Sequence, residues 1–178
     1  HDPLLEALKV SAAGNIIDFG VKHFNRDQLK EEIEKIHTLS FHRIDIEAFR
    51  KQLEHAKTIL FIGDNAGEIV FDRILIETMQ KLSHNAEIVF ACREKPILND
   101  VTIEDAVEIG MDKVARVISS GSLYPGTIYN EGTEEFKRLF KSADLVMAKG
   151  QGNYETLCGM APRDLFYILR IKCDVLSQ

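Results

Sequence analysis

Residues 61–68, with the sequence FIGDNAGE, constrain the fold of this chain more than any other stretch. They follow the apolar run 58–62, which has the composition of a buried strand, and they precede residues 69–82, where apolar side chains recur at helical spacing. Residues 63–67 are therefore predicted to form a turn between a strand and a helix. In an open α/β sheet, ligands bind at such turns, beyond the carboxyl ends of the strands.

Strands and helices are predicted to alternate through the rest of the chain. Strands are expected at residues 58–62, 87–91, 114–118, 145–148 and 165–171, with helices at 69–82, 101–109 and 133–140. Such alternation is typical of a parallel sheet with right-handed crossovers. The apolar run 88–90 has no polar face, as a strand covered on both sides requires.

Before the first strand, the sequence predicts mainly helix. Helical spacing of apolar residues covers 2–24, a charged helix is expected at 28–36, and another helix runs from Asp45 to His55. Residues 41–45 are expected to form a short edge segment. The chain begins with His-Asp-Pro rather than with Met, so we expect a fragment or a processed protein.

Length and charge narrow the class of protein. The 178 residues suffice for a substantial hydrophobic core, and the net charge of −6 argues against broad nucleic-acid binding. No apolar run is long enough to cross a bilayer, and no secretory signal is visible. The three cysteines lie far apart and form no zinc-binding spacing, which favours a reduced, cytoplasmic setting.

Polar clusters follow the predicted strands and should converge. They comprise residues 63–68, 93–100, 119–127 and 149–154, together with Lys172. Because the carboxyl ends of parallel strands share one edge of a sheet, these clusters are expected to lie close together.

The residue types in these clusters suit phosphoryl-group hydrolysis. Asp64, Asn65 and Asp100 can build an all-oxygen site for Mg²⁺ or Mn²⁺ and leave positions for water and substrate. Lys149 and Lys172 can neutralise a phosphate. A metal would polarise the phosphoryl oxygen, and the cations would stabilise charge in the transition state.

Simpler interpretations exist for the same residues. Asp64 and Asn65 could cap the helix that follows them, and Asp100 could cap the helix at Val101. Lys172 could be a solvated residue at the end of a strand.

Four motifs resemble the metal-dependent damage-control phosphatases, formerly called domain of unknown function 89, and most closely their archaeal and bacterial branch. The motifs are GDNAGE at 63–68, REKPILNDVT at 93–102, the pair Ser120-Gly-Ser122 and Pro125-Gly-Thr127, and ADLVMAKGQGNYE at 143–155. The resemblance extends from about Asp2 to the end of the chain.

The resemblance implies a Rossmann-like α/β/α sandwich and a phosphomonoesterase acting on small metabolites, such as sugar phosphates or damaged phosphometabolites. It places a divalent ion (Mn²⁺, Mg²⁺, Co²⁺ or Ni²⁺) on Asp64, Asn65 and Asp100, which are also the expected catalytic residues. It places substrate on the positions Glu68, Asn99, Asn153 and Lys172. Arg93, Ser122 and Lys149 complete the predicted substrate-binding set.

Members of the family carry a helical region that this chain mostly lacks. Residues 1–56 are therefore expected to be the remainder of a larger helical region, and residues 57–178 to form a Rossmann-like metal- and phosphate-binding domain. The nucleophile is either metal-activated water or Asp64 itself. Two alternatives are an S-adenosylmethionine-dependent carboxyl methyltransferase, and a phosphate- or nucleotide-binding module that is inactive without a missing amino-terminal part.

Overall fold

A five-stranded sheet forms the centre of the structure, a computed structural model that describes residues 2–14, 41, 45–160 and 165–169. The strands are β1 (Thr58–Ile62), β2 (Glu87–Cys92), β3 (Arg116–Ser119), β4 (Leu145–Lys149) and β5 (Phe166–Ile168). Their order is β3-β2-β1-β4-β5, and each neighbouring pair is parallel. The predicted α/β class with a parallel sheet is confirmed.

The strand order reverses between β1 and β4, which creates a topological switch point. From β1 the chain progresses outward to β2 and β3, and it then returns to place β4 on the other side of β1. In doubly wound sheets, ligands bind in the crevice at this point, outside the carboxyl ends of the strands. The turns that begin at Gly63 and Gly150 border this crevice.

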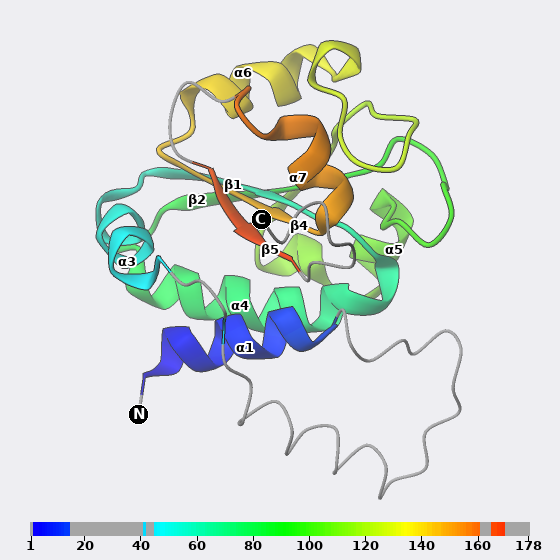
Figure 1. The fold of residues 1–178 in the computed structure, drawn as a ribbon. Coiled ribbons are helices and arrows are strands. Elements are labelled where there is room, and N and C mark those ends of the chain that lie inside the picture. Colours follow the sequence, from blue (N-terminus) through cyan, green and yellow to red (C-terminus); the bar gives the residue numbers. More distant parts are fainter. Residues whose placement is uncertain (1, 15–40, 42–44, 161–164, 170–178) are drawn as a thin grey trace, which may run out of the picture.

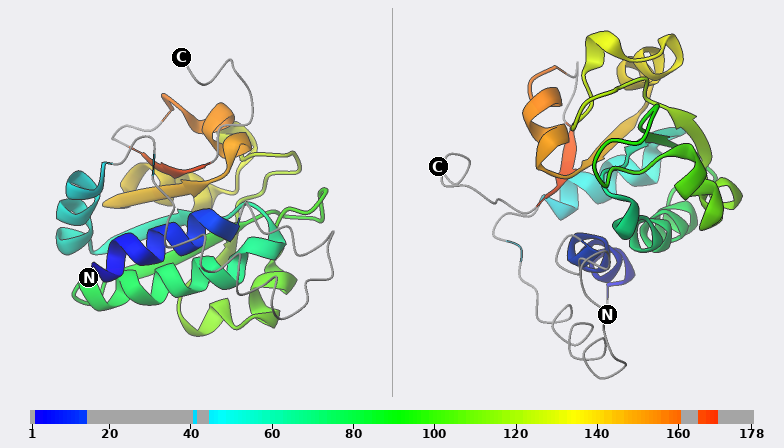
Figure 2. Two further views of the ribbon diagram at one scale, coloured as in Figure 1. Left: turned by 60° about the horizontal axis from the view of Figure 1, so that its bottom comes forward. Right: turned by 90° about the vertical axis from the view of Figure 1, so that its right-hand side faces the viewer.

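Helices cover both faces of the sheet. In the described residues the α-helices are α1 (Pro3–Gly14), α3 (Ile46–His55), α4 (Ile69–Leu82), α5 (Ile103–Glu108), α6 (Glu134–Ser142) and α7 (Gln151–Leu157), joined by the 3₁₀ turns η1 (Ala66–Glu68), η2 (Met111–Lys113) and η3 (Tyr129–Glu131). Figures 1 and 2 show α1 and α4 running side by side beneath the sheet, with α6 and α7 on the opposite face. The predicted three-layer α/β/α sandwich is therefore present.

Alternation along β1 explains why two helical layers are needed. Ile59 and Phe61 belong to the core beneath the sheet, whereas Leu60 and Ile62 belong to the core above it. Successive side chains of a strand point to opposite faces, so a strand without polar residues must be covered twice. Phe61 also stacks on Phe90 of β2, with ring centroids 5.6 Å apart.

Most predicted bounds agree with the structure, and the differences have local causes. The predicted strand at 114–118 begins only at Arg116, because Gly110, with φ of 73°, starts the η2 turn that occupies the preceding residues. The predicted helix at 101–109 begins at Ile103, because Thr102 caps it through a reciprocal capping box with Asp105. Residues 151–154 form the start of α7, where the sequence predicted a polar cluster and no helix.

The amino-terminal helices share the core of the sheet. Leu4 and Leu8 of α1, with Phe49 and Leu53 of α3, belong to the same buried cluster as Phe61. The division of the chain at residue 56 stays a prediction. The expected helices beyond Gly14 and at 28–36, most of the segment 41–45, and the end of the strand expected at 165–171 lie outside the described residues.

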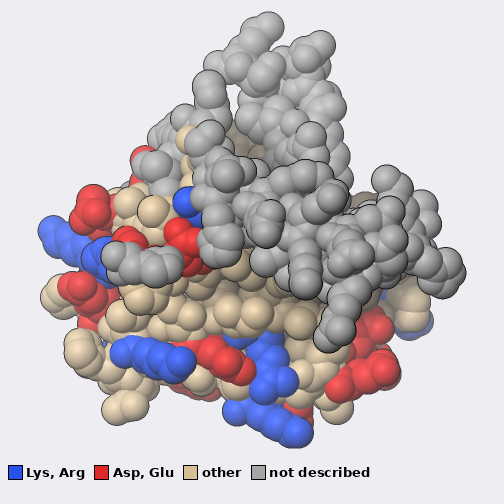
Figure 3. All heavy atoms as spheres, turned by 90° about the horizontal axis from the view of Figure 1, so that it is seen from below, with Lys and Arg blue, Asp and Glu red and all other residues tan. Residues whose placement is uncertain are grey.

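The surface charge and the helix lengths of the described residues concern two kinds of partner, nucleic acids and membranes. In the view of Figure 3, Lys and Arg side chains are interspersed with Asp and Glu around an uncharged band. None of the described helices combines the length and the apolarity that a membrane crossing requires.

Candidate functional site

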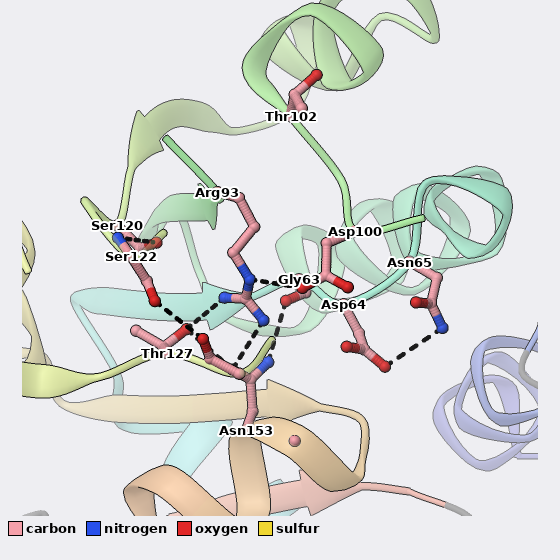
Figure 4. Close-up of polar contacts among 12 residues, drawn as sticks. Gly63, Asp64, Asn65, Arg93, Asp100, Thr102, Ser120, Ser122, Thr127 and Asn153 are labelled. Carbon is pink, nitrogen blue, oxygen red and sulfur yellow. Dashed lines mark hydrogen bonds and ion pairs between the residues drawn. The ribbon is translucent and has the colours of Figure 1, made fainter. Parts of the chain in front are cut away.

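Two turns join at the carboxyl edge of the sheet and bring the predicted metal ligands together. The Ala66 amide donates to the Asn99 carbonyl oxygen at 2.8 Å, and the Val101 amide donates to the Asp64 carbonyl oxygen at 2.8 Å. Between these bonds, Asn65 and Asp100 form an antiparallel bridge. Figure 4 shows the Asp64, Asn65 and Asp100 side chains directed toward a common space.

None of the three side chains, Asp64, Asn65 and Asp100, serves as the helix cap that the simpler interpretation proposed. Asn65 precedes η1, but no side-chain cap bond forms there. Asp100 lies two residues before Thr102, which caps α5 instead. The Asp64 side chain reaches toward Gly150, not toward the helix that follows.

Asp64 lies at the switch point in close contact with the turn after β4. A Cβ atom on Gly150 would lie 1.9 Å from Asp64 Oδ2, so only glycine leaves room for this carboxylate. Burial, followed by the neighbouring carboxylates of Glu68 and Asp100, raises the pKa of Asp64 to about 7, although the positive charges of Arg93 and Lys149 oppose the shift. Asp64 therefore lies in a buried position beside two other carboxylates.

Arg93 is a buried hub that holds three loops. Its Nε donates to Asp100 Oδ2 at 2.7 Å, its Nη1 to Thr127 Oγ1 at 2.5 Å, and its Nη2 to Asn153 Oδ1 at 3.2 Å. The side chain is fully shielded from solvent. Arg93 was predicted to contact substrate phosphate, but in this structure its guanidinium is directed at protein oxygens and orients Asp100.

Asn153 ties the ends of the two strands at the switch point. Its Nδ2 donates to the carbonyl oxygens of Gly63 at 3.0 Å and Lys149 at 2.8 Å. Its Oδ1 accepts from Thr127 and Arg93. A side-chain amide offers two donors and two acceptor positions, so protein groups occupy all four. Substrate contact by Asn153 stays a prediction, while the structure gives it a bracing role.

Lys149 lies beneath the site in a buried ionic cluster. Its Nζ contacts the Ser11 carbonyl oxygen at 3.0 Å, Glu68 Oε2 at 3.0 Å and Asp72 Oδ1 at 2.7 Å. Burial alone would lower the pKa of Lys149, but the two carboxylates outweigh it and raise that pKa. Lys149 therefore stays charged, and its three donors all meet protein oxygens. Its contact with substrate phosphate stays a prediction.

Glu68 links this cluster to the predicted metal ligands. Its Oε1 accepts from Asn65 Nδ2 at 2.6 Å, while its Oε2 pairs with Lys149. Only 3% of its surface is exposed. Glu68 was predicted to meet substrate, and the structure directs both of its carboxylate oxygens to protein groups.

The remaining predicted residues differ in exposure. Ser122 is buried and donates to the Gly126 carbonyl oxygen at 2.9 Å, which braces the loop after β3. Asn99 is exposed beside Asp100, as a residue that meets substrate would be. Lys172 lies outside the described residues.

Among the described residues, carboxylates outnumber cations around the site. Asp64, Glu68, Asp72 and Asp100 supply four carboxylates, and the described cations near them are Arg93 and Lys149. With all of these groups ionised, the described residues carry two more negative than positive charges, which a divalent cation would neutralise. Within the described ranges no group of three His, Cys, Asp or Glu side chains is arranged to hold a metal. A cation would thus rest on Asp64, Asp100 and the amide oxygen of Asn65, a hard-oxygen set that suits Mg²⁺ or Mn²⁺.

Sequence reasoning missed three supporting residues, which are Asp72, Thr127 and Ser11. Asp72 could have been found, because it falls on the same helical face as Ile69, Leu75 and Met79, which are all buried. A carboxylate on an apolar face needs a partner, and Lys149 provides one. Thr127 lies in the polar cluster 119–127 and in the motif Pro125-Gly-Thr127, but it was not singled out as a site residue. For Ser11 we find no comparable signal in the sequence.

Comparisons with known proteins agree with the fold and motifs. The family model described as "Damage-control phosphatase ARMT1-like domain" matches residues 1–178. A damage-control phosphatase of Pyrococcus horikoshii is 39% identical over 172 residues, covering 97% of this chain and 59% of the relative. An uncharacterized protein of Methanocaldococcus jannaschii is 41% identical, covering 99% of this chain and 60% of the relative.

The crystal structure of the DUF89 family protein from Pyrococcus horikoshii superposes with a TM-score of 0.91 at 38% identity, over 98% of this chain and 60% of that one. The chain thus spans about three-fifths of the length of the relatives it matches. Because the family model matches the whole sequence, the chain belongs to the damage-control phosphatase ARMT1-like domain family.

Proposed function

We propose that this chain carries the site of a metal-dependent phosphatase that hydrolyses phosphate monoesters of small metabolites, such as sugar phosphates or damaged phosphometabolites. The observation that carries the proposal is the convergence of Asp64, Asn65 and Asp100 at the switch point of the sheet, in a cluster where the described carboxylates outnumber the described cations. The relatives named damage-control phosphatases support the same class of reaction, and their names favour it over the methyltransferase alternative.

Asp64, Asn65 and Asp100 would hold the cation, which we propose to be Mn²⁺, Mg²⁺, Co²⁺ or Ni²⁺. When bound, such an ion supplies a Lewis acid for a phosphoryl oxygen and neutralises charge as the ester is cleaved. Arg93 keeps Asp100 in place with its Nε 2.7 Å from Oδ2. Fixed ligands of this kind cost no reorganisation during the reaction, which is the basis of electrostatic catalysis.

The protonation state of Asp64 should control cation binding at the site. With a pKa near 7 it is partly protonated at neutral pH, and it must release that proton to bind a cation. Among the predicted substrate residues that the structure describes, Asn99, at the rim beside Asp100, is the exposed one. Its amide can donate to a phosphate oxygen and accept from a sugar hydroxyl, which suits a small polar ester.

An activity screen tests this proposal. The chain and its variants Asp64→Asn and Asp100→Asn would be assayed on sugar phosphates, nucleotides and pantetheine phosphates with each of the four ions. We expect turnover by the unaltered chain and loss of about 100-fold or more in both variants, because each removes a charged ligand of the ion. Asp112→Asn, on the exposed η2 turn, is the matched control and should keep full activity. Full activity in either site variant would refute the assignment.

A second candidate is a module that binds cation and phosphate but turns over substrate only with further parts of a longer protein. The observation that favours it is the match to about three-fifths of each relative's length. Cation binding without turnover by this chain, and turnover in a longer form carrying the same residues, would support this candidate over the first.

A further inference from the structure

Lys149 is fully buried near the site, and its contacts connect α1 to the predicted metal ligands. Besides the two carboxylates, it contacts the carbonyl oxygen of Ser11 at 3.0 Å. Ser11 lies in the last turn of α1, where carbonyl oxygens lack partners within the helix and form the negative end of its dipole. The Ser11 hydroxyl also donates to Asp72 Oδ1 at 2.6 Å. The lysine is thus held from three directions.

Lys149 also determines which carboxylate oxygen of Glu68 is directed at Asn65. Lys149 Nζ lies 3.0 Å from Glu68 Oε2, which leaves Oε1 directed at Asn65 Nδ2, 2.6 Å away. A carboxylate paired with lysine accepts hydrogen bonds and donates none. Asn65 must therefore present its NH₂ group to Glu68, and Nδ2 lies also within 3.4 Å of Asp64 Oδ2.

An asparagine amide has one oxygen, so the direction of Nδ2 determines the direction of Oδ1. With Nδ2 engaged by the two carboxylates, Oδ1 is turned to the side of Asp100, as Figure 4 shows. Only the oxygen of an amide can ligate a hard cation. The reversed amide would direct an NH₂ group into the site and would repel the ion.

We propose that Lys149 is a positioning residue that sets the orientation of the Asn65 amide through Glu68, with α1 holding the lysine in place through the Ser11 carbonyl. The inference rests on the proposed function, in which Asn65 is a metal ligand. It assigns Lys149 and Glu68 a role other than the substrate contact expected from the sequence. Mutating a group that orients a metal ligand typically weakens metal binding by about 10- to 100-fold.

Removing the lysine gives the first test. Lys149→Met keeps the length of the side chain but frees Glu68 to turn away from Asn65. We expect its Mn²⁺ dissociation constant, measured by calorimetry, to rise by about 10- to 100-fold, the usual effect of removing a group that orients a ligand. Because this variant leaves two buried carboxylates without a cation, it is also at risk of not folding.

A charge-matched pair keeps the test decisive if Lys149→Met does not fold. In Glu68→Gln, the new amide oxygen must accept from Lys149, so the new NH₂ group faces Asn65 and forces its amide to reverse. In Asp72→Asn, the amide oxygen can still accept from Lys149 and Ser11, and the Glu68–Asn65 contact is untouched. Both variants remove one negative charge from the same cluster, but only the first changes the partner of Asn65.

We expect Glu68→Gln to weaken Mn²⁺ binding by about 10-fold or more, and Asp72→Asn to weaken it several-fold less. Equal losses in the two variants would mean that the charge of the cluster matters and the orientation of Asn65 does not, which would overturn the proposal.

A readout without metal separates this inference from the proposed function. The side-chain NH₂ signals of Asn65 in the NMR spectrum of the metal-free chain report its hydrogen bond to Glu68. They should shift in Glu68→Gln and stay in place in Asp72→Asn. If the chain binds no Mn²⁺ at all, the proposed function fails while these signals still decide the role of the cluster. Unchanged signals in Glu68→Gln would contradict the positioning role even if metal binds.

Discussion

Arg93 and Asp100 form an ion pair buried from solvent, with the Arg93 Nε atom 2.7 Å from Asp100 Oδ2. The remaining guanidinium nitrogens reach Thr127 and Asn153, which belong to the segments after β3 and β4. One cation therefore connects the segments that follow three strands, two loops and the start of α7. Arginine suits this position because its planar fork of donors can serve several acceptors at once.

Two substitutions of Arg93 should separate the effect of its charge on stability from the effect of its hydrogen-bond geometry. Arg93→Met leaves Asp100 buried without a cation and should lower the free energy of unfolding by about 3–5 kcal/mol. Arg93→Lys keeps the charge but offers one terminal nitrogen. Its free energy of unfolding should therefore lie between those of the unaltered chain and Arg93→Met, and it should bind Mn²⁺ more weakly than the unaltered chain. Urea unfolding and calorimetry measure these effects.

The control for Arg93 is Arg116, whose guanidinium pairs with Glu87 and Glu135 on the surface and is 41% exposed. Arg116→Met should cost less than about 1 kcal/mol, because exposed ion pairs contribute little. Equal destabilisation by Arg93→Met and Arg116→Met would contradict the hub role of Arg93.

Gly150 should not tolerate substitution, because of its backbone conformation and because of its close contact with Asp64. Its φ is 82°, which strains any other residue, and its Cβ would overlap Asp64 Oδ2. Gly159 has a φ of 76° but open space around its missing side chain. Gly159→Ala should therefore cost only about 1–2 kcal/mol of backbone strain, and it should leave Mn²⁺ binding intact.

Gly150→Ala should carry the same strain and should also displace Asp64, with loss of Mn²⁺ binding. Thermal denaturation and calorimetry on both variants separate the two effects. Normal Mn²⁺ affinity in Gly150→Ala would show that Asp64 does not need its present place.

The raised pKa of Asp64 makes stability depend on pH. Between its ordinary value of 3.8 and about 7, the folded chain binds a proton at Asp64 that the unfolded chain has released. Stability from this group is therefore greatest at low pH and falls as the pH rises through that window, without metal. The melting temperature of the metal-free chain should fall more between about pH 5 and pH 8 than that of Asp64→Asn.

Metal should reverse this trend, because the cation replaces the proton. Mn²⁺ affinity should increase as the pH rises through 7, with release of a proton on binding. Calorimetry in buffers of different ionisation enthalpy counts that proton. An identical pH dependence of stability in the unaltered chain and Asp64→Asn would refute the assignment of the raised pKa to this residue.

The sequence pattern identified the elements that carry strong periodicity. The bounds of β1 and α4 agree with prediction residue for residue, because an apolar strand, a glycine turn and a long amphipathic helix follow one another there. The helix α7 was missed because Gly150, Gln151 and Gly152 have the composition of a turn. Its helical state depends on tertiary contacts of Asn153 and Leu157, which are buried, and no local pattern reports those contacts.

The sequence also did not predict the directions of the long polar side chains. Arg93 and Lys149 follow strands at the edge where ligands bind, so a role at substrate phosphate was the natural expectation. Each instead extends into the protein, toward Asp100 or toward Asp72. The choice depends on acceptors that lie far away in the sequence, such as the Ser11 carbonyl oxygen, 138 residues before Lys149. Periodicity and composition hold no information on such pairs.

Calorimetric titration of the chain with Mn²⁺, alongside Asp64→Asn and Asp100→Asn, examines the proposed metal site most directly. If Asp64, Asn65 and Asp100 share one ion, the unaltered chain should bind a single equivalent, and each variant should lose that binding while still unfolding cooperatively. Binding of equal strength in all three proteins, or no binding by the unaltered chain, would contradict a metal centre at this edge of the sheet.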